Sequence, residues 1–186
     1  MKTLILSVLV AFCTLSYGQK LLVTPNGLRD SSDNEKRYIV LNFEGKSSKQ
    51  LFENALKYLN KNYKSPNDVI KGKTDGEYLK FITHISDFLI VNNSGAKIKI
   101  DADYTIELNF KDGKVKFEII SLDMYTQDGG LYHVLFTGGA FEGYPIYNKK
   151  GELKRPETKT EIETFFNTTI NSLSNFLFDK SDIDKW

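Results

Sequence analysis

Cysteine is nearly absent from this chain of 186 residues, in which Cys13 is the only one. It lies inside an apolar run from Leu4 to Leu15, which follows the basic residue Lys2 and precedes a short stretch ending in Gly18. This order is typical of a secretory signal peptide, with cleavage expected between Gly18 and Gln19. A chain cleaved there contains no cysteine, which excludes disulfides and cysteine metal sites from the mature protein.

The sequence also lacks an apolar run long enough to serve as a membrane anchor. The opening run holds 12 residues, whereas a helix needs about 20 to cross the hydrocarbon core. Bulky Phe12 stands where a lipoprotein signal needs a small residue, which argues against lipidation of Cys13. We therefore expect residues 1–18 to be removed and the protein to be exported, periplasmic or extracellular, without a membrane anchor.

An excess of charge of either sign is missing as well. Without Lys2, the only charged residue of the first 18, 24 basic residues face 24 acidic ones. Proteins that bind nucleic acids through phosphates need a clustered basic surface. The balanced and interspersed charges therefore argue against a nucleic-acid partner and indicate an ordinary solvated surface.

Helical spacing appears in two places. Ser47 and Gln50 have the spacing of a capping box, and the apolar residues that follow form one helical stripe: Phe52, Ala55, Leu56, Leu59 and Tyr63. Pro66 is expected to end this first helix. Thr158 and Glu161 predict a second capping box, for a C-terminal amphipathic helix over residues 156–179.

Between these helices the apolar residues recur at every second position. A buried strand is expected from Tyr38 to Phe43, and strands over 69–73 and 77–85 flank a turn at residues 74–76. Residues 98–110 alternate between an apolar and a wet face, and Asp112-Gly113 predicts a tight turn before a returning strand. Tyr104, Ile106 and Phe117 are expected on the buried face.

The predicted element order is one strand, one helix, four strands in a meander, a long loop and a final helix. It predicts an α+β fold in which two helices pack on one face of a curved antiparallel sheet. We expect an N-terminal extension over residues 19–36 and a single domain over residues 37–180. The domain includes a segment rich in glycine and aromatic residues over 126–155.

The residues from Tyr38 to Gly45, the helix that begins at Ser47, and the meander ending near Tyr125 are similar to a family of exported bacterial proteins. That family is built on a domain of unknown function with a fold like that of the TATA-binding protein. The resemblance covers residues 37–125, and the stretch from Tyr144 to Gly151 resembles full-length relatives. It implies the same element order and export, but no reaction, because function depends on sites and not on architecture.

Residues for catalysis are few. Only His84 and His133 are present, without metal-ligand spacing between them, and no serine lies in a nucleophile motif. Asp101, Asp103 and Glu107 share a strand face, where a cation or an acid–base pair is conceivable, but Lys97 and Lys99 on that face favour simple ion pairing. The sequence therefore predicts no catalytic residue, metal ligand or cofactor.

The segment over residues 126–155 combines glycines with flat aromatic side chains. Such rings stack on sugars or anchor a partner protein, because they supply contact area at low entropic cost. The candidate surface consists of these residues: Tyr132, Phe136, Phe141, Tyr144 and Tyr147. The alternative is that residues 131–137 form another strand and that the aromatic residues close the core.

Three functions remain open on the sequence alone. The leading hypothesis is a non-catalytic binding protein of the bacterial envelope, whose partner is an envelope protein, a glycan or a small ligand. The second is an enzyme whose site forms only in three dimensions, with His133, Asp123 or Asp128 taking part. The third is a carrier that holds an apolar ligand between the last helix and the sheet.

Overall fold

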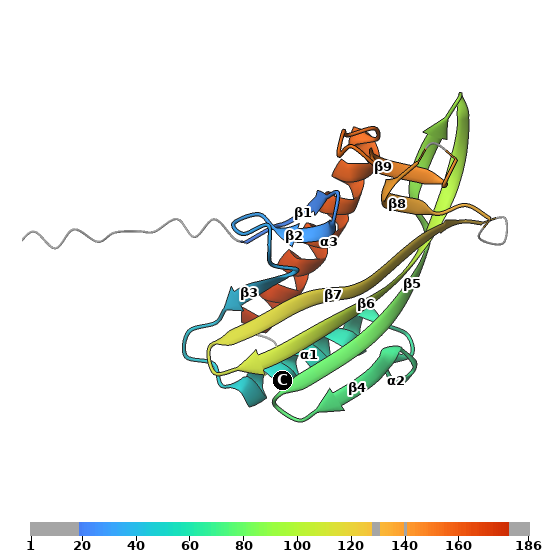
Figure 1. Ribbon diagram of the computed structural model, residues 1–186. Helices are drawn as coiled ribbons and strands as arrows, with labels where there is room; N and C mark the ends of the chain where they lie inside the picture. Colours follow the sequence, from blue (N-terminus) through green and yellow to red (C-terminus); the bar gives the residue numbers. More distant parts are fainter. Residues whose placement is uncertain (1–18, 128–130, 140, 179–186) are drawn as a thin grey trace, which may run out of the picture.

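The computed structural model describes residues 19–127, 131–139 and 141–178. The expected signal peptide with Gly18, and the candidate Asp128, lie outside the described residues. Along the chain the elements are, in order (Figure 1), β1 (Leu21–Thr24), β2 (Gly27–Asp30), β3 (Tyr38–Asn42), α1 (Ser48–Asn62), α2 (Pro66–Val69), β4 (Ile70–Thr74), β5 (Tyr78–Asn93), β6 (Ala96–Lys111), β7 (Lys114–Thr126), β8 (Val134–Gly138), β9 (Tyr144–Asn148) and α3 (Pro156–Phe178).

The main sheet has five antiparallel strands in the order β3-β7-β6-β5-β4. Strands β4 to β7 form the expected meander, and Gly113, with φ of +71°, lies in the turn between β6 and β7. Strands β5, β6 and β7 are long and bend along their length (Figure 1). Three bulges interrupt the pairing of the sheet: one in β4 between Ile70 and Gly72, one in β5 between Ile85 and Leu89, and one in β7 opposite the step from Thr105 to Ile106. Bulges increase local twist and bend a strand.

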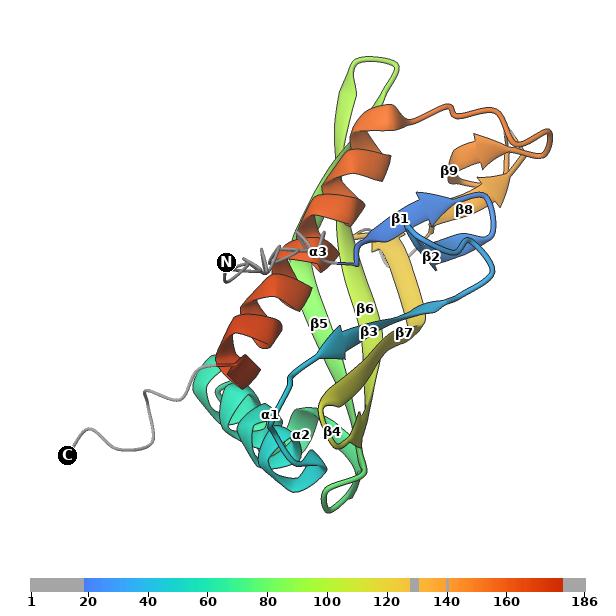
Figure 2. The ribbon, with the colours of Figure 1, turned by 90° about the vertical axis from the view of Figure 1, so that its left-hand side faces the viewer.

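Helices α1 and α3 cover the same face of this sheet (Figure 2). The side chains of Tyr104, Ile106 and Phe117 point into the interface and are at most 3% exposed. The Phe166 ring of α3 meets the Tyr104 ring edge-on at 5.3 Å, and Tyr58 and Phe176 join the two helices at 5.7 Å. The predicted α+β architecture, with two helices on one sheet face, is confirmed.

The first helix begins as the sequence indicates. The Gln50 amide donates to the Ser47 hydroxyl at 3.2 Å, and the Gln50 side chain accepts from the Ser47 amide at 3.0 Å. The helix ends at Asn62, ahead of Pro66, and Pro66 opens the short helix α2 instead. A proline fits the first helical position because its missing N–H would have no partner there.

The second predicted capping box, at Thr158 and Glu161, is wrong. Helix α3 begins at Pro156, so Thr158 lies within its first turn, where its side chain is buried. The Lys159 amide donates to the Arg155 carbonyl at 3.1 Å, which places the helix start before Thr158. Proline at the helix start overrode the Thr–Glu spacing as the start signal.

The segment over residues 19–36 forms the hairpin β1–β2, whose strands pair from Leu21 with Asp30 to Thr24 with Gly27. Its side chains Leu21 and Val23 are buried with the rest of the core. Helix α3 bonds to the hairpin's backbone, since Asn167 accepts from the Leu21 amide at 2.9 Å and donates to its carbonyl at 3.0 Å.

Candidate functional site

The chain between β7 and α3 folds into a small parallel pair, β8 and β9, which pairs Val134 with Tyr144 and Thr137 with Tyr147. A tight approach closes this pair. The Tyr144 amide donates to the His133 carbonyl at 2.8 Å, and an added Cβ on Gly143 would lie 2.4 Å from the same oxygen. Gly143 has φ of +108°, so only glycine fits this position without strain.

Three of the five predicted aromatic residues come together beside this pair. Tyr132, Phe141 and Tyr144 line a pocket of about 420 Å³, hereafter the aromatic pocket. Its remaining lining residues are Asn93, Gly143 and Arg155. The volume lies within the range of about 300–1,000 Å³ that is usual for small-molecule sites.

The aromatic rings differ in how firmly they are held. Tyr144 is 8% exposed, and its ring centre lies 5.9 Å from that of Tyr132 at an angle of 56°. Tyr132 is 46% exposed, and Phe141 is completely exposed. An aromatic side chain that is fully exposed at the rim of a pocket buries its apolar surface only when a ligand or partner binds against it.

Arg155 is the cationic group of the aromatic pocket. Its guanidinium lies 5.2 Å from the centre of the Tyr144 ring, and one nitrogen donates to the Asn92 carbonyl at 3.1 Å. The Arg155 amide also bonds to Ile146 in β9, at 3.2 Å. The guanidinium is thus held by the end of the β5–β6 hairpin and by a ring of the pocket, while the backbone of Arg155 is bonded to β9.

The other two predicted residues, Phe136 and Tyr147, do not line the aromatic pocket. Tyr147 is 8% exposed and donates to the Val23 carbonyl at 2.9 Å, so it joins β9 to the N-terminal hairpin. Phe136 packs against the core, near Gly27 of the same hairpin. Both residues close the core in the way the alternative expectation described.

Glu142, in the loop before β9, is held by two bonds. It accepts from the Gly139 amide at 2.8 Å and from the Lys149 ammonium at 2.5 Å. The Lys149 hydrogen bond, followed by the Gly139 amide, lowers the pKa of this carboxyl below its ordinary value. The pair neutralises both charges close to Phe141, so Arg155 dominates the local charge.

The open face of the sheet carries both histidines. His84 Nδ1 lies 3.0 Å from Asp103, and His133 Nδ1 lies 2.8 Å from Asp123. Asp103 and Asp123 are direct neighbours across β6 and β7, and the Tyr125 hydroxyl donates to Asp103 at 2.9 Å. That bond raises the pKa of Tyr125. Each histidine thus has the carboxylate neighbour that an acid–base group needs.

These histidine pairs lie in the open. The His133 and Asp123 side chains are 44% and 60% exposed, and neither histidine lines the aromatic pocket. In the same region the Gln127 amide bonds to Asp101 at 2.7 Å, which lowers the pKa of Asp101. Within the described ranges, no three or more His, Cys, Asp or Glu side chains are grouped to hold a metal ion.

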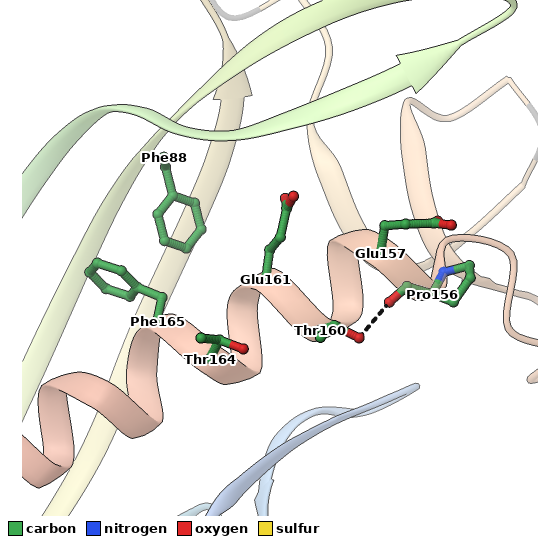
Figure 3. A pocket seen from close by; sticks show the side chains of 7 residues that line it. All are labelled: Phe88, Pro156, Glu157, Thr160, Glu161, Thr164 and Phe165. Carbon is green, nitrogen blue, oxygen red and sulfur yellow. Dashed lines mark hydrogen bonds between the residues drawn. The ribbon is translucent and has the colours of Figure 1, made fainter.

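A second and larger pocket, hereafter the α3 groove, lies between the first half of α3 and the bulge of β5. Its volume is about 680 Å³. Figure 3 shows Phe165, Glu161 and Glu157 projecting from α3 and Phe88 reaching toward them from β5. The Phe88 and Phe165 rings meet edge-on at 5.0 Å, and the Thr160 hydroxyl is bonded within the helix to Pro156.

The sequence alone pointed to neither Asn93 nor Arg155. Asn93 is far along the chain from the aromatic residues it joins, and Arg155 lies in their segment but is separated from Tyr144 by a stretch without a clear period. Asn93 ends β5 in a hairpin extension, and Arg155 precedes α3. The Arg-Pro pair before an amphipathic helix is the one local signal that could have placed Arg155 beside the end of the segment.

No helix in the described part of the chain is both long and apolar enough to span a membrane. A search of the curated proteins found no match. Residues 38–125 match the model of the family described as a domain of unknown function (DUF4468) with TBP-like fold.

Two solved structures share the fold. The crystal structure of a DUF4468 family protein from Bacteroides ovatus is 14% identical, with a TM-score of 0.54, over 80% of this chain and 88% of that chain. A TBP-like protein from Parabacteroides distasonis is 11% identical, with a TM-score of 0.52, over 75% of this chain and 90% of that chain. At such identities the likeness concerns the fold alone, and neither description names a reaction or a ligand. The chain is therefore similar to the DUF4468 family over residues 38–125, and its fold is TBP-like.

Proposed function

We propose that the protein is an exported, non-catalytic binding protein of the bacterial envelope, which holds a sugar unit of a glycan in the aromatic pocket. The observation that carries this proposal is the convergence of Tyr132, Phe141 and Tyr144 around one pocket. Flat rings bind the apolar face of a sugar, and their hydroxyls remain available for its hydroxyl groups.

Several features of the pocket support binding. Tyr144 and Arg155 are held by the fold, whereas Phe141 is completely exposed at the rim. Three polar groups have no hydrogen-bond partner among the residues that the structure describes. They are the hydroxyls of Tyr132 and Tyr144 and the side-chain amide of Asn93. A sugar site combines firmly held residues, such as Tyr144 here, with an exposed ring, such as Phe141, and with polar groups that have no other partner.

Export is supported by the pattern of residues 1–18. Expression of the full chain in a Gram-negative host, followed by fractionation and intact-mass measurement, tests it. We expect a periplasmic or secreted product that begins at Gln19. A cytoplasmic product of full mass would contradict export.

The binding test is a glycan array followed by titration calorimetry, with the wild type beside Phe141→Ala and Tyr132→Ala. We expect each variant to lose about tenfold in affinity for any glycan that binds. Phe178→Ala is the matched control, because Phe178 is also an exposed phenylalanine, 67% exposed, but lies at the end of α3. Equal affinity in all four proteins would rule out the aromatic pocket as the site.

A second candidate function has its own observation, which is the α3 groove. It lies between helix and sheet, as the carrier hypothesis requires, and Phe88 and Phe165 form its apolar floor. Native mass spectrometry with palmitate tests this function, beside Thr164→Trp, which places a large ring in the groove. Binding by the wild type and loss in the variant would favour a carrier, and binding by neither protein would exclude palmitate-like ligands.

The histidine pairs on the open sheet face do not enter either proposal. Both pairs are about half exposed, and their residues line neither the aromatic pocket nor the α3 groove, where a substrate could be held against them. A reaction needs a reacting atom held close to the acid–base group.

A further inference from the structure

We infer that the sugar in the aromatic pocket is an acidic one, whose carboxylate binds the guanidinium of Arg155. This inference rests on the proposed function and adds the charge of the ligand. The chemical class is therefore a saccharide unit that carries a carboxylate, such as a uronic acid.

Arg155 carries the charge that an acidic ligand needs. Among the residues that the structure describes, no carboxylate forms an ion pair with Arg155, whereas two lysines of the same loop are neutralised. Lys154 pairs with Glu152 at 2.9 Å, and Lys149 pairs with Glu142 at 2.5 Å. Arg155 thus keeps its charge, and it is the charged residue in the lining of the aromatic pocket.

Arg155 also has hydrogen-bond donors that the fold does not use. Of its several N–H groups, one nitrogen donates to the Asn92 carbonyl. The remaining N–H groups form a planar fork that matches the two oxygens of a carboxylate. Because the Asn92 carbonyl and the Tyr144 ring already hold the guanidinium in place, little side-chain freedom is lost when the anion binds.

The other lining residues are compatible with an anionic sugar. The remaining lining residues of the aromatic pocket carry no charge, so nothing in the lining opposes an anion. Tyr132, Tyr144 and Asn93 add groups that can bond to sugar hydroxyls. A ring face, several hydroxyl-binding groups and one cation together match a sugar with one carboxylate better than they match a neutral sugar.

The experiment compares a galacturonic acid trisaccharide with the corresponding galactose trisaccharide, by titration calorimetry at low and high salt. We expect the acidic sugar to bind the wild type about 10- to 100-fold more tightly than the neutral one, as is usual for a charged hydrogen-bonded pair. High salt should reduce this preference, because the pair is partly exposed.

Arg155→Gln should abolish the preference for the acidic sugar while leaving the weaker binding of the neutral sugar. Arg155→Lys should retain part of it, since a lysine keeps the charge but not the fork. The control is Lys154→Gln, which removes an adjacent cation that is already paired. Circular dichroism melts of all variants check that the bond to Asn92 is not needed for folding.

The outcomes separate the two proposals. Equal binding of both sugars, unchanged in Arg155→Gln but weakened in Phe141→Ala, would overturn the acidic ligand and keep the sugar site. Binding of neither trisaccharide, together with silence on the glycan array, would overturn both proposals. Tighter binding of uridine monophosphate than of the acidic sugar, lost in Arg155→Gln, would overturn the sugar class and assign the site to a phosphate compound.

Discussion

Gly143 shows how one residue shapes the aromatic pocket. Its backbone lies in the left-handed region, and the His133 carbonyl occupies the place where a side chain would begin. That carbonyl also accepts from Tyr144, so the glycine permits the approach that seats the Tyr144 ring.

Gly143→Ala is therefore expected to lower the free energy of unfolding by about 1–3 kcal/mol and to weaken ligand binding. Gly151→Ala is the matched control, because Gly151 also has a positive φ, +79°, but an added Cβ meets nothing within 4 Å. Urea denaturation measures the free energy of unfolding of both variants. The difference between the variants isolates the contact with His133, and equal losses would show that only the backbone strain matters.

Glu142 makes the pocket loop sensitive to acid. Its pKa is lowered by Lys149 and by the Gly139 amide, so the bonds of this carboxylate are complete above the ordinary glutamate range and are lost as the pH falls through the lowered pKa. We expect the Gly139 amide resonance to shift in a single step below about pH 4.5. Nuclear magnetic resonance titration measures this step.

Glu142→Gln should remove that step, because an amide does not titrate in this range. A step with its midpoint at or above the ordinary glutamate value would contradict the bond to Lys149. If the Gly139 amide resonance of the wild type showed no pH-dependent step, the Gly139 amide would have an acceptor other than Glu142.

At the scale of elements, the sequence predicted those features that depend on neighbours along the chain. Two-residue alternation placed Tyr104, Ile106 and Phe117 in the core correctly, and the Ser47–Gln50 spacing located the start of α1. The pairing of β8 with β9 was not foreseen, because five residues separate these strands and no alternation runs through them. Parallel pairing depends on contacts that local sequence patterns do not encode.

The cap of α1 carries a prediction of its own. Ser47→Ala removes the oxygen that accepts from Gln50, so we expect a loss of about 1 kcal/mol in the free energy of unfolding. Ser48→Ala is the control, because Ser48 is the first helical residue and contributes its backbone amide, not its hydroxyl, to a bond with Asp112. Equal thermal stability of the two variants would show that the cap contributes nothing to the folded state.

At the scale of the whole molecule, helix α3 holds together parts that lie far apart in the chain. Its apolar face packs on the sheet through Phe166, while its polar residues bind the backbone of the N-terminal hairpin. Glu163 accepts from the Val23 amide at 2.8 Å, and Asn167 accepts from and donates to Leu21. These bonds join residues more than a hundred positions apart, and no local sequence pattern reveals such contacts. The sequence alone therefore predicted residues 19–36 as an extension outside the domain.

Asn167→Ala tests this connection. It removes both bonds to Leu21 and leaves a part-buried backbone amide and carbonyl without their partner, which should cost about 1–3 kcal/mol in the free energy of unfolding. Hydrogen exchange of the Leu21 amide should accelerate more than exchange within β6, since the hairpin would open before the sheet does. Thr168→Ala, at the neighbouring exposed position, is the control and should leave both quantities unchanged. Uniform acceleration across β1 and β6 would instead mean that hairpin and sheet unfold as one unit. Strand β9, which Tyr147 joins to Val23 and which carries Tyr144 of the aromatic pocket, would then depend on the stability of the whole molecule.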